Sequence, residues 1–106
     1  MVRIIFTVID QFHHKIRLTD ERFKHILERP EMISAESQIK ETILVPEIIK
    51  ESKHDVKVQI YYGPYEKTPV TKKYLAVIVK ILNHEGFVIT SYYTDKIKEG
   101  KTLWKR

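Results

Sequence analysis

The sequence predicts an α+β fold, with two early helices packed on an antiparallel sheet. Two apolar runs, 72–81 and 87–93, are rich in β-branched and aromatic residues and flank a short turn at 83–86. We expect Gly86 to supply the positive φ of that turn, so that the runs form a hairpin at the centre of the sheet. Helical spacing of apolar residues occurs earlier, between residues 19 and 44. Helices followed by consecutive strands are typical of the α+β class.

A first peripheral hairpin is predicted before the helices. Residues 3–9 and 12–18 are rich in strand-forming side chains, with a turn at Asp10 and Gln11. His13 and His14 would then point to opposite faces of a strand and could not easily share one metal ion. We therefore assign no metal site.

The first helix is predicted to begin at Asp20, with Thr19 as its N-cap. An apolar stripe at 23, 26 and 27 would seat it on the sheet. Arg22, His25 and Arg29 then share one flank of the helix. A second helix is expected from a cap at residue 34 to residue 44, with a proline at 46 ending it.

The second half of the chain is predicted to consist of strands and loops. Residues 47–53 suit either a short strand or a loop. Residues 56–62 alternate cleanly, which points Tyr62 inward and Tyr61 outward. The basic tail at 96–106 is expected to dock back on the body, and one further strand is one way for it to do so.

Composition and charge narrow the class of protein. The chain of 106 residues has no linker-like stretch and suits a single domain, 1–106. It contains no cysteine, which excludes disulfides and thiolate chemistry. No apolar run approaches the ~20 residues that cross a bilayer, and no signal peptide is evident, so we expect a cytoplasmic protein without membrane contact.

The net charge of +5 lies entirely in the second half of the chain. Residues 54–106 carry 10 Lys and Arg against 5 Asp and Glu, whereas residues 1–53 carry 9 of each. A basic half built around a sheet fits an anionic partner such as a phosphate backbone. Ordinary solubility charge on exposed strands fits equally well.

Several fragments, in order, resemble the phage-associated barnase/EndoU/colicin/RelE-like nucleases. They are Leu-Thr-Asp-Glu-Arg-Phe-Lys-His-Ile at 18–26, Pro-Glu-Met at 30–32, Glu-Thr-Ile at 41–43, Tyr-Tyr at 61–62, the runs 74–79 and 87–92, and a late Gly and Trp. The resemblance covers about residues 15–106, in short and degenerate pieces. It implies two N-terminal helices on a curved antiparallel sheet of four or more strands. It also implies a ribonuclease of phage or toxin type that needs no metal or cofactor, with RNA as substrate and an inhibitor or immunity protein as a possible partner.

The family pattern has a helix histidine, matching His25, and a Thr-Ala-Tyr, matching Thr90-Ser91-Tyr92. Where the pattern has Arg-His-Pro-Glu, this chain has Arg29 followed directly by Pro-Glu, so a second histidine is missing. That departure keeps open a non-catalytic RNA- or protein-binding module on the same scaffold. A structural domain of a phage assembly is a third hypothesis.

The implied reaction is attack of an RNA 2′-OH on the adjacent phosphorus. Histidine is the residue type most often used as a general base or acid, which makes His25 the candidate for that role. Thr90 and Tyr92, two apart on a strand, share one face, where hydroxyls can donate to a phosphate and the ring can stack on a base. Each residue type is also common on surfaces and in strands without any such role. The candidate substrate-binding residues are Arg29, Arg22, Lys73 and Tyr61, and Lys72 and Lys80 are further phosphate anchors.

The orientation of the late strand is open from the sequence. If the helices cover the face of Phe87 and Ile89, then Thr90 and Tyr92 point away from the first helix. The helices could instead cover the face that carries Val88 together with Thr90 and Tyr92.

Overall fold

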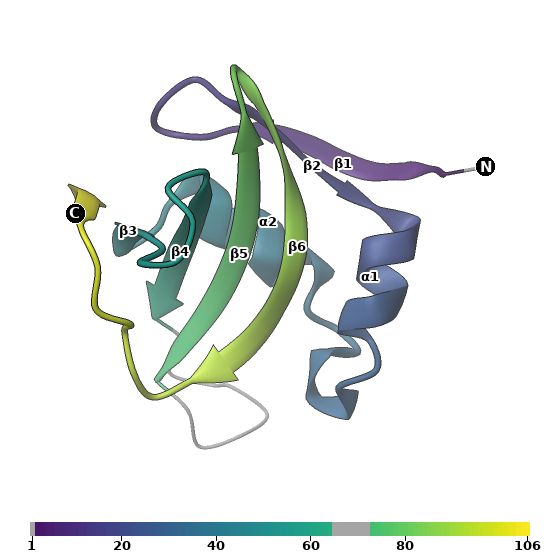
Figure 1. Ribbon diagram of the computed structural model, residues 1–106. Helices are drawn as coiled ribbons and strands as arrows, with labels where there is room; N and C mark the ends of the chain where they lie inside the picture. The colour runs from purple at the N-terminus through teal and green to yellow at the C-terminus, as the bar shows by residue number, and fades with distance from the viewer. Residues whose placement is uncertain (1, 65–72) are drawn as a thin grey trace.

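Figure 1 shows the computed structural model, which describes residues 2–64 and 73–106; the candidate Lys72 lies outside them. The described residues form one sheet of seven strands with helices on one face. The strand order across the sheet is β1 (Ile4–Ile9), β2 (Lys15–Thr19), β6 (Glu85–Thr94), β5 (Tyr74–Leu82), β4 (Val58–Pro64), β3 (Ile48–Glu51) and β7 (Thr102–Lys105). All neighbours are antiparallel except β2 and β6, which are parallel.

The α+β class is confirmed, but the expected N-terminal position of the helices is wrong. The helical segments are α1 (Asp20–Ile26), the 3₁₀ turn η1 (Pro30–Met32) and α2 (Glu36–Leu44), and they follow the β1–β2 hairpin. The sheet is mixed rather than wholly antiparallel, because β2 joins β6 in the same direction. Among the described residues, no helix is both long and apolar enough to cross a bilayer.

The helix boundaries follow local signals in part. Thr19 caps α1 as predicted, and its hydroxyl accepts a hydrogen bond from the backbone N–H of Arg22 at 3.3 Å. The second helix begins later than expected, at Glu36 after Ala35, without a side-chain cap. Its end at Leu44 agrees with the prediction from the following proline.

The β5–β6 turn differs from the prediction at Gly86. Asn83 has the positive φ, 60°, and Gly86 lies within β6. A Cβ atom at Gly86 would lie 2.9 Å from the backbone carbonyl oxygen of Lys80, and equally close to the Cδ1 atoms of Ile16 and Ile81. Glycine is therefore required here by close packing between strands rather than by turn geometry.

A β-bulge in β6 decides which way the late hydroxyl residues point. Thr90 pairs with Ile78 and Val88 with Val79, which leaves Ile89 as an extra residue. Val88 is consequently buried under the helices, while Thr90 points to the opposite face. The first of the two arrangements is right that Thr90 and Tyr92 point away from the helices, but it puts the wrong residues under them, because the bulge turns Val88 to the helix side.

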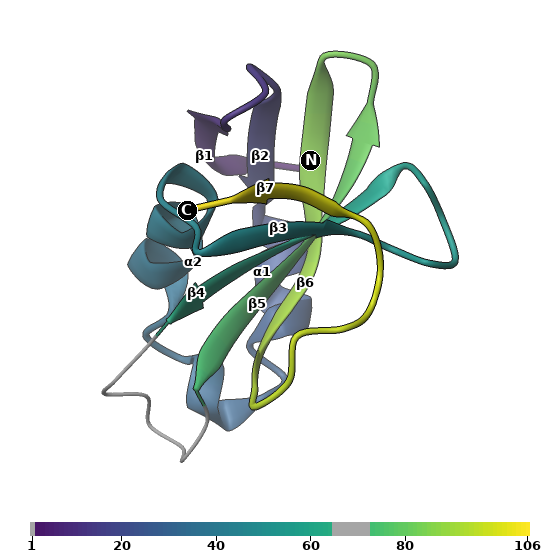
Figure 2. The same cartoon turned by 90° about the vertical axis from the view of Figure 1, so that its left-hand side faces the viewer.

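Both faces of the sheet are covered. The helices bury one face around core residues such as Ile26, Ile39 and Val77. The other face, here called the helix-free face, has a smaller apolar cluster around Ile60 and Tyr62, and the crossing segment (residues 95–101) runs over it between β6 and β7. Figure 2 shows this segment on the side of the sheet away from the helices. The basic tail does contribute a strand, because β7 pairs with β3.

Candidate functional site

Three of the predicted site residues meet at the edge of β6. The guanidinium of Arg29 donates a hydrogen bond from Nη1 to Thr90 Oγ1 at 3.2 Å. Its Cζ atom also lies 5.5 Å from the centre of the Tyr92 ring, within the range of a cation–π contact. Arg29, Thr90 and Tyr92 are called the Arg29 cluster below.

Arg29 can approach this edge of β6 because β2 is short. It pairs with β6 only at residues 85–87, and among the described residues the rest of β6 has no strand neighbour on that side. The helix α1 packs alongside this part of β6 (Figure 1). Arg29 follows α1, and its long side chain extends around the edge to the helix-free face, where Thr90 and Tyr92 lie. Arg29 thus meets Thr90 and Tyr92, although it lies beyond the end of α1 rather than on the helix flank expected for it.

His25 lies in the last turn of α1, one helical turn before Arg29 in the sequence. Its side chain is 51% exposed, and Nδ1 lies 3.5 Å from Glu28 Oε2. His25 is therefore in contact with Glu28, whereas the hydrogen bond to Thr90 comes from Arg29. Arg22 is exposed on the same helix, three residues before His25.

Lys73 is exposed directly before β5, where its backbone N–H donates to Asp95 Oδ1 at 3.2 Å. Residue 76, which faces Tyr92, is three positions further along the strand, or about 10 Å away. Lys73 is therefore at the periphery of the Arg29 cluster.

Tyr61 was predicted to face outward and bind substrate, and the structure contradicts this. Its side chain is fully buried under the helices, and its hydroxyl donates a hydrogen bond to Asp10. Burial and the Asp10 carboxylate both raise the pKa of Tyr61 far above its usual value. A base cannot stack on a ring that is covered in this way.

The sequence reasoning missed the buried Asp10 as an organising residue. Its carboxylate accepts hydrogen bonds from the backbone N–H groups of Phe12 at 2.9 Å and His14 at 2.8 Å. Its other oxygen lies 2.9 Å from His14 Nδ1 and also accepts from Tyr61. These contacts fasten the β1–β2 loop to the sheet. An Asp just before a loop was a visible signal, since Asp commonly bonds the backbone two residues on.

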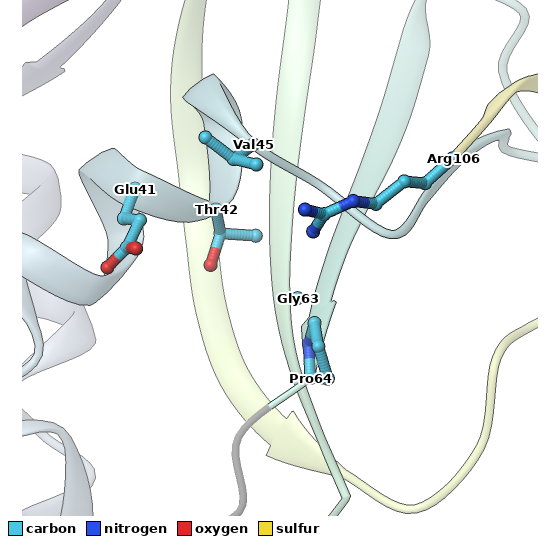
Figure 3. Close-up of a pocket in the computed structure, with 6 residues that line it drawn as sticks. All are labelled: Glu41, Thr42, Val45, Gly63, Pro64 and Arg106. Carbon is cyan, nitrogen blue, oxygen red and sulfur yellow. The ribbon is translucent and has the colours of Figure 1, made fainter.

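Hollows in the described surface occur on both sides of the sheet. One of about 230 Å³ lies between α2 and β4. Figure 3 shows Arg106 extending its guanidinium toward Thr42 and Val45 across this hollow, while the carboxylate of Glu41 points away. It shares no residue with the Arg29 cluster.

A second hollow, of about 340 Å³, lies on the helix-free face. Ile60 contributes to it from β4, together with residues 52–54 after β3 and residues 98–99 of the crossing segment. No local pattern in the sequence predicts this hollow, because its two walls come from segments more than 40 residues apart.

Comparison of the chain with family models, curated proteins and solved structures finds no match. The α+β architecture and the Arg29 cluster therefore stand on the structure alone. The resemblance to the barnase/EndoU/colicin/RelE-like nucleases stays a prediction that rests on the sequence fragments.

Proposed function

We propose that this chain is a metal-independent endoribonuclease, of phage or toxin type, that binds RNA at the Arg29 cluster. The observation that supports the proposal is the contact of the Arg29 guanidinium with Thr90 and Tyr92. A guanidinium offers several N–H donors in a plane that matches phosphate oxygens, and a hydroxyl and an aromatic ring lie beside it. Cation, hydroxyl and ring together fit one nucleotide with its phosphate.

The proposed reaction transfers a phosphoryl group within the RNA strand. The 2′-oxygen forms a bond to phosphorus while the bond from phosphorus to the 5′-oxygen breaks, leaving a cyclic phosphate and a free 5′-OH. His25 takes the proton of the 2′-OH, and the leaving oxygen receives a proton from Tyr92 or water. Arg29 and Thr90 donate to the phosphate oxygens as negative charge develops on them.

A non-catalytic RNA-binding module is the second candidate. It is favoured by the partner of His25, since Glu28 lies beside the ring, and by the make-up of the Arg29 cluster, which contains no histidine or carboxylate to act as a general base. Such a module would keep the phosphate contacts without turnover.

The test is a cleavage assay with end-labelled single-stranded RNA in the presence of a chelator. We expect cyclic phosphate ends from the wild type, and a loss of rate of about a hundredfold or more in His25→Ala and in Arg29→Ala. His84→Ala and Arg3→Ala are matched controls, because both residues are exposed and lie outside the Arg29 cluster. Salt-sensitive RNA binding without cleavage would select the binding module, and neither activity would reject both candidates.

A further inference from the structure

A row of side chains leads across the helix-free face from the Arg29 cluster to the second hollow. Thr90 is opposite Ile78 on β5, and Ile78 is opposite Ile60 on β4. Neighbouring strands lie about 4.8 Å apart, so Thr90 and Ile60 are separated by about 10 Å. Ile60 belongs to the hollow, which makes this row a direct path between the two places.

The hollow has an apolar floor and a charged rim. Ile60 forms the floor, with Lys53 and His54 on one wall and Lys98 and Glu99 on the other. We call this place the Lys98 hollow. Lys53 Nζ forms an ion pair with Glu99 Oε2 at 2.9 Å across the opening, and both side chains are well exposed.

The charges of the Lys98 hollow leave one positive charge in excess. Lys53 and Glu99 compensate each other, and Lys98 adds a further cation. Nearby, Asp55 and Lys80 compensate each other at 2.5 Å, and this contact lowers the pKa of Asp55. An apolar floor under a cationic rim suits a nucleobase with its phosphate.

We propose that the Lys98 hollow is a second subsite for the same single-stranded RNA that occupies the Arg29 cluster. This inference rests on the proposed RNA function. Nucleotides in a stacked strand advance about 3.4 Å each, so the hollow takes a nucleotide within about three positions of the phosphate at Arg29. The strand must be single, because a base can enter the hollow only when it is not paired and stacked in a duplex.

The subsite predicts a length dependence of binding. Lys98→Gln should weaken binding of a labelled ten-nucleotide oligouridylate about fivefold at 0.1 M salt. The plot of log affinity against log salt should become shallower by about 0.7, the value for one lost phosphate contact in a single strand. Binding of a uridine dinucleotide, followed by NMR titration, should be unchanged because it is too short to reach from Arg29 to the hollow.

Glu99→Gln should act in the opposite direction. It frees Lys53 from its ion pair and removes a negative charge from the rim, so the ten-nucleotide strand should bind more tightly and with a steeper salt dependence. Matched controls are Lys40→Gln and Glu36→Gln, because both residues are exposed on α2. Neither control should change binding of either probe.

The outcomes separate the two proposals. If Arg29→Ala weakens both probes but Lys98→Gln and Glu99→Gln behave like their controls, the subsite is rejected and the RNA function stands. If the wild type binds neither probe, the RNA function fails and the subsite fails with it. Opposite shifts in the two variants, confined to the longer strand, support the subsite.

Discussion

Tyr61 illustrates how a single buried hydroxyl depends on its neighbours. Removing its proton would place a phenolate beside the buried Asp10 carboxylate, away from water. Both effects raise the pKa of Tyr61, so in the folded chain it stays protonated and donates its hydrogen bond. An unfolded chain holds its tyrosines in water, where they lose the proton near pH 10.

This difference predicts alkaline instability. Above about pH 10 the unfolded state loses the Tyr61 proton and the folded state keeps it, so the free energy of unfolding should fall by up to about 1.4 kcal/mol per pH unit from this group. Below pH 10 the contribution is fully present. Urea titrations between pH 8 and 11 should show a shallower decline for Tyr61→Phe than for the wild type. Equal slopes for the two proteins would contradict the prediction.

At the residue scale, the sequence predicts the ends of helices correctly, but it does not predict which side chains are buried. Thr19 as a cap and the helix end at Leu44 depend on neighbours a few residues away, and both were predicted correctly. The alternating pattern predicts an outward Tyr61 only if one face of the sheet meets water. The sheet is covered on both faces, so Tyr61 and Tyr62 are both buried.

The crossing segment leads into β7 at Gly100, where its backbone approaches the backbone of β3 closely. Gly100 has φ +154°, and a Cβ atom there would overlap the carbonyl oxygen of Glu51. Lys50 Nζ donates to Gly100 O at 3.3 Å and to Thr102 Oγ1 at 2.8 Å. The backbone N–H of Glu51 donates to the carbonyl oxygen of Lys101 at 2.9 Å. The start of β7 is thus attached to β3 through a position that only glycine fits.

Gly100→Ala should therefore loosen β7. We expect the variant to lose about 1–3 kcal/mol of unfolding free energy, because either the backbone or the strand pairing must shift. Hydrogen exchange should accelerate at the amides that join β3 and β7, with β5 and β6 unaffected at first. Lys101→Ala is the matched control, since its side chain is exposed and its carbonyl hydrogen bond is kept. Unchanged exchange at the β3–β7 amides in Gly100→Ala would show that the position tolerates a side chain.

At the element scale, the strands themselves were predicted better than their irregularities. The late hairpin, the first hairpin and the tail strand all exist. The bulge at Ile89 could not be predicted, because an extra residue in one strand is visible only against its partner. The bulge puts Val88 and Thr90 on opposite faces of the sheet, so Val88 is absent from the helix-free face that carries Thr90.

The whole molecule is organised around a single continuous sheet. Its central pair β5 and β6 contributes to the apolar clusters on both faces, for example through Val77 on one side and Ala76 on the other. Trp104, the sole tryptophan, lies on β7 at one edge of the sheet and packs against the helix-side core. Unfolding of either cluster would expose the strands shared with the other.

We therefore expect cooperative, two-state unfolding. Trp104 fluorescence and far-ultraviolet circular dichroism should give the same urea midpoint, because the edge strand reports on the same transition as the sheet. An earlier fluorescence transition would contradict this and would mean that β7 separates before the body unfolds. Gly100→Ala is the variant in which such a separation would be seen first.

At this scale, the fold class followed from the order of helical and strand patterns, and the arrangement in space did not. The parallel β2–β6 pair and the β3–β7 pair join segments far apart in the chain, and no local pattern specifies them. The Arg29 cluster was only partly foreseen for the same reason. Arg29 and the two hydroxyl residues were named, but their meeting depends on a helix placed beside a strand edge.

The contact between Arg29 and Thr90 joins residues 61 positions apart. During synthesis on the ribosome, a nascent chain therefore exposes Arg29 long before Thr90 has been added. The proposed nuclease centre can assemble only after Thr90 has left the exit tunnel, so a nascent chain that still lacks Thr90 cannot carry it.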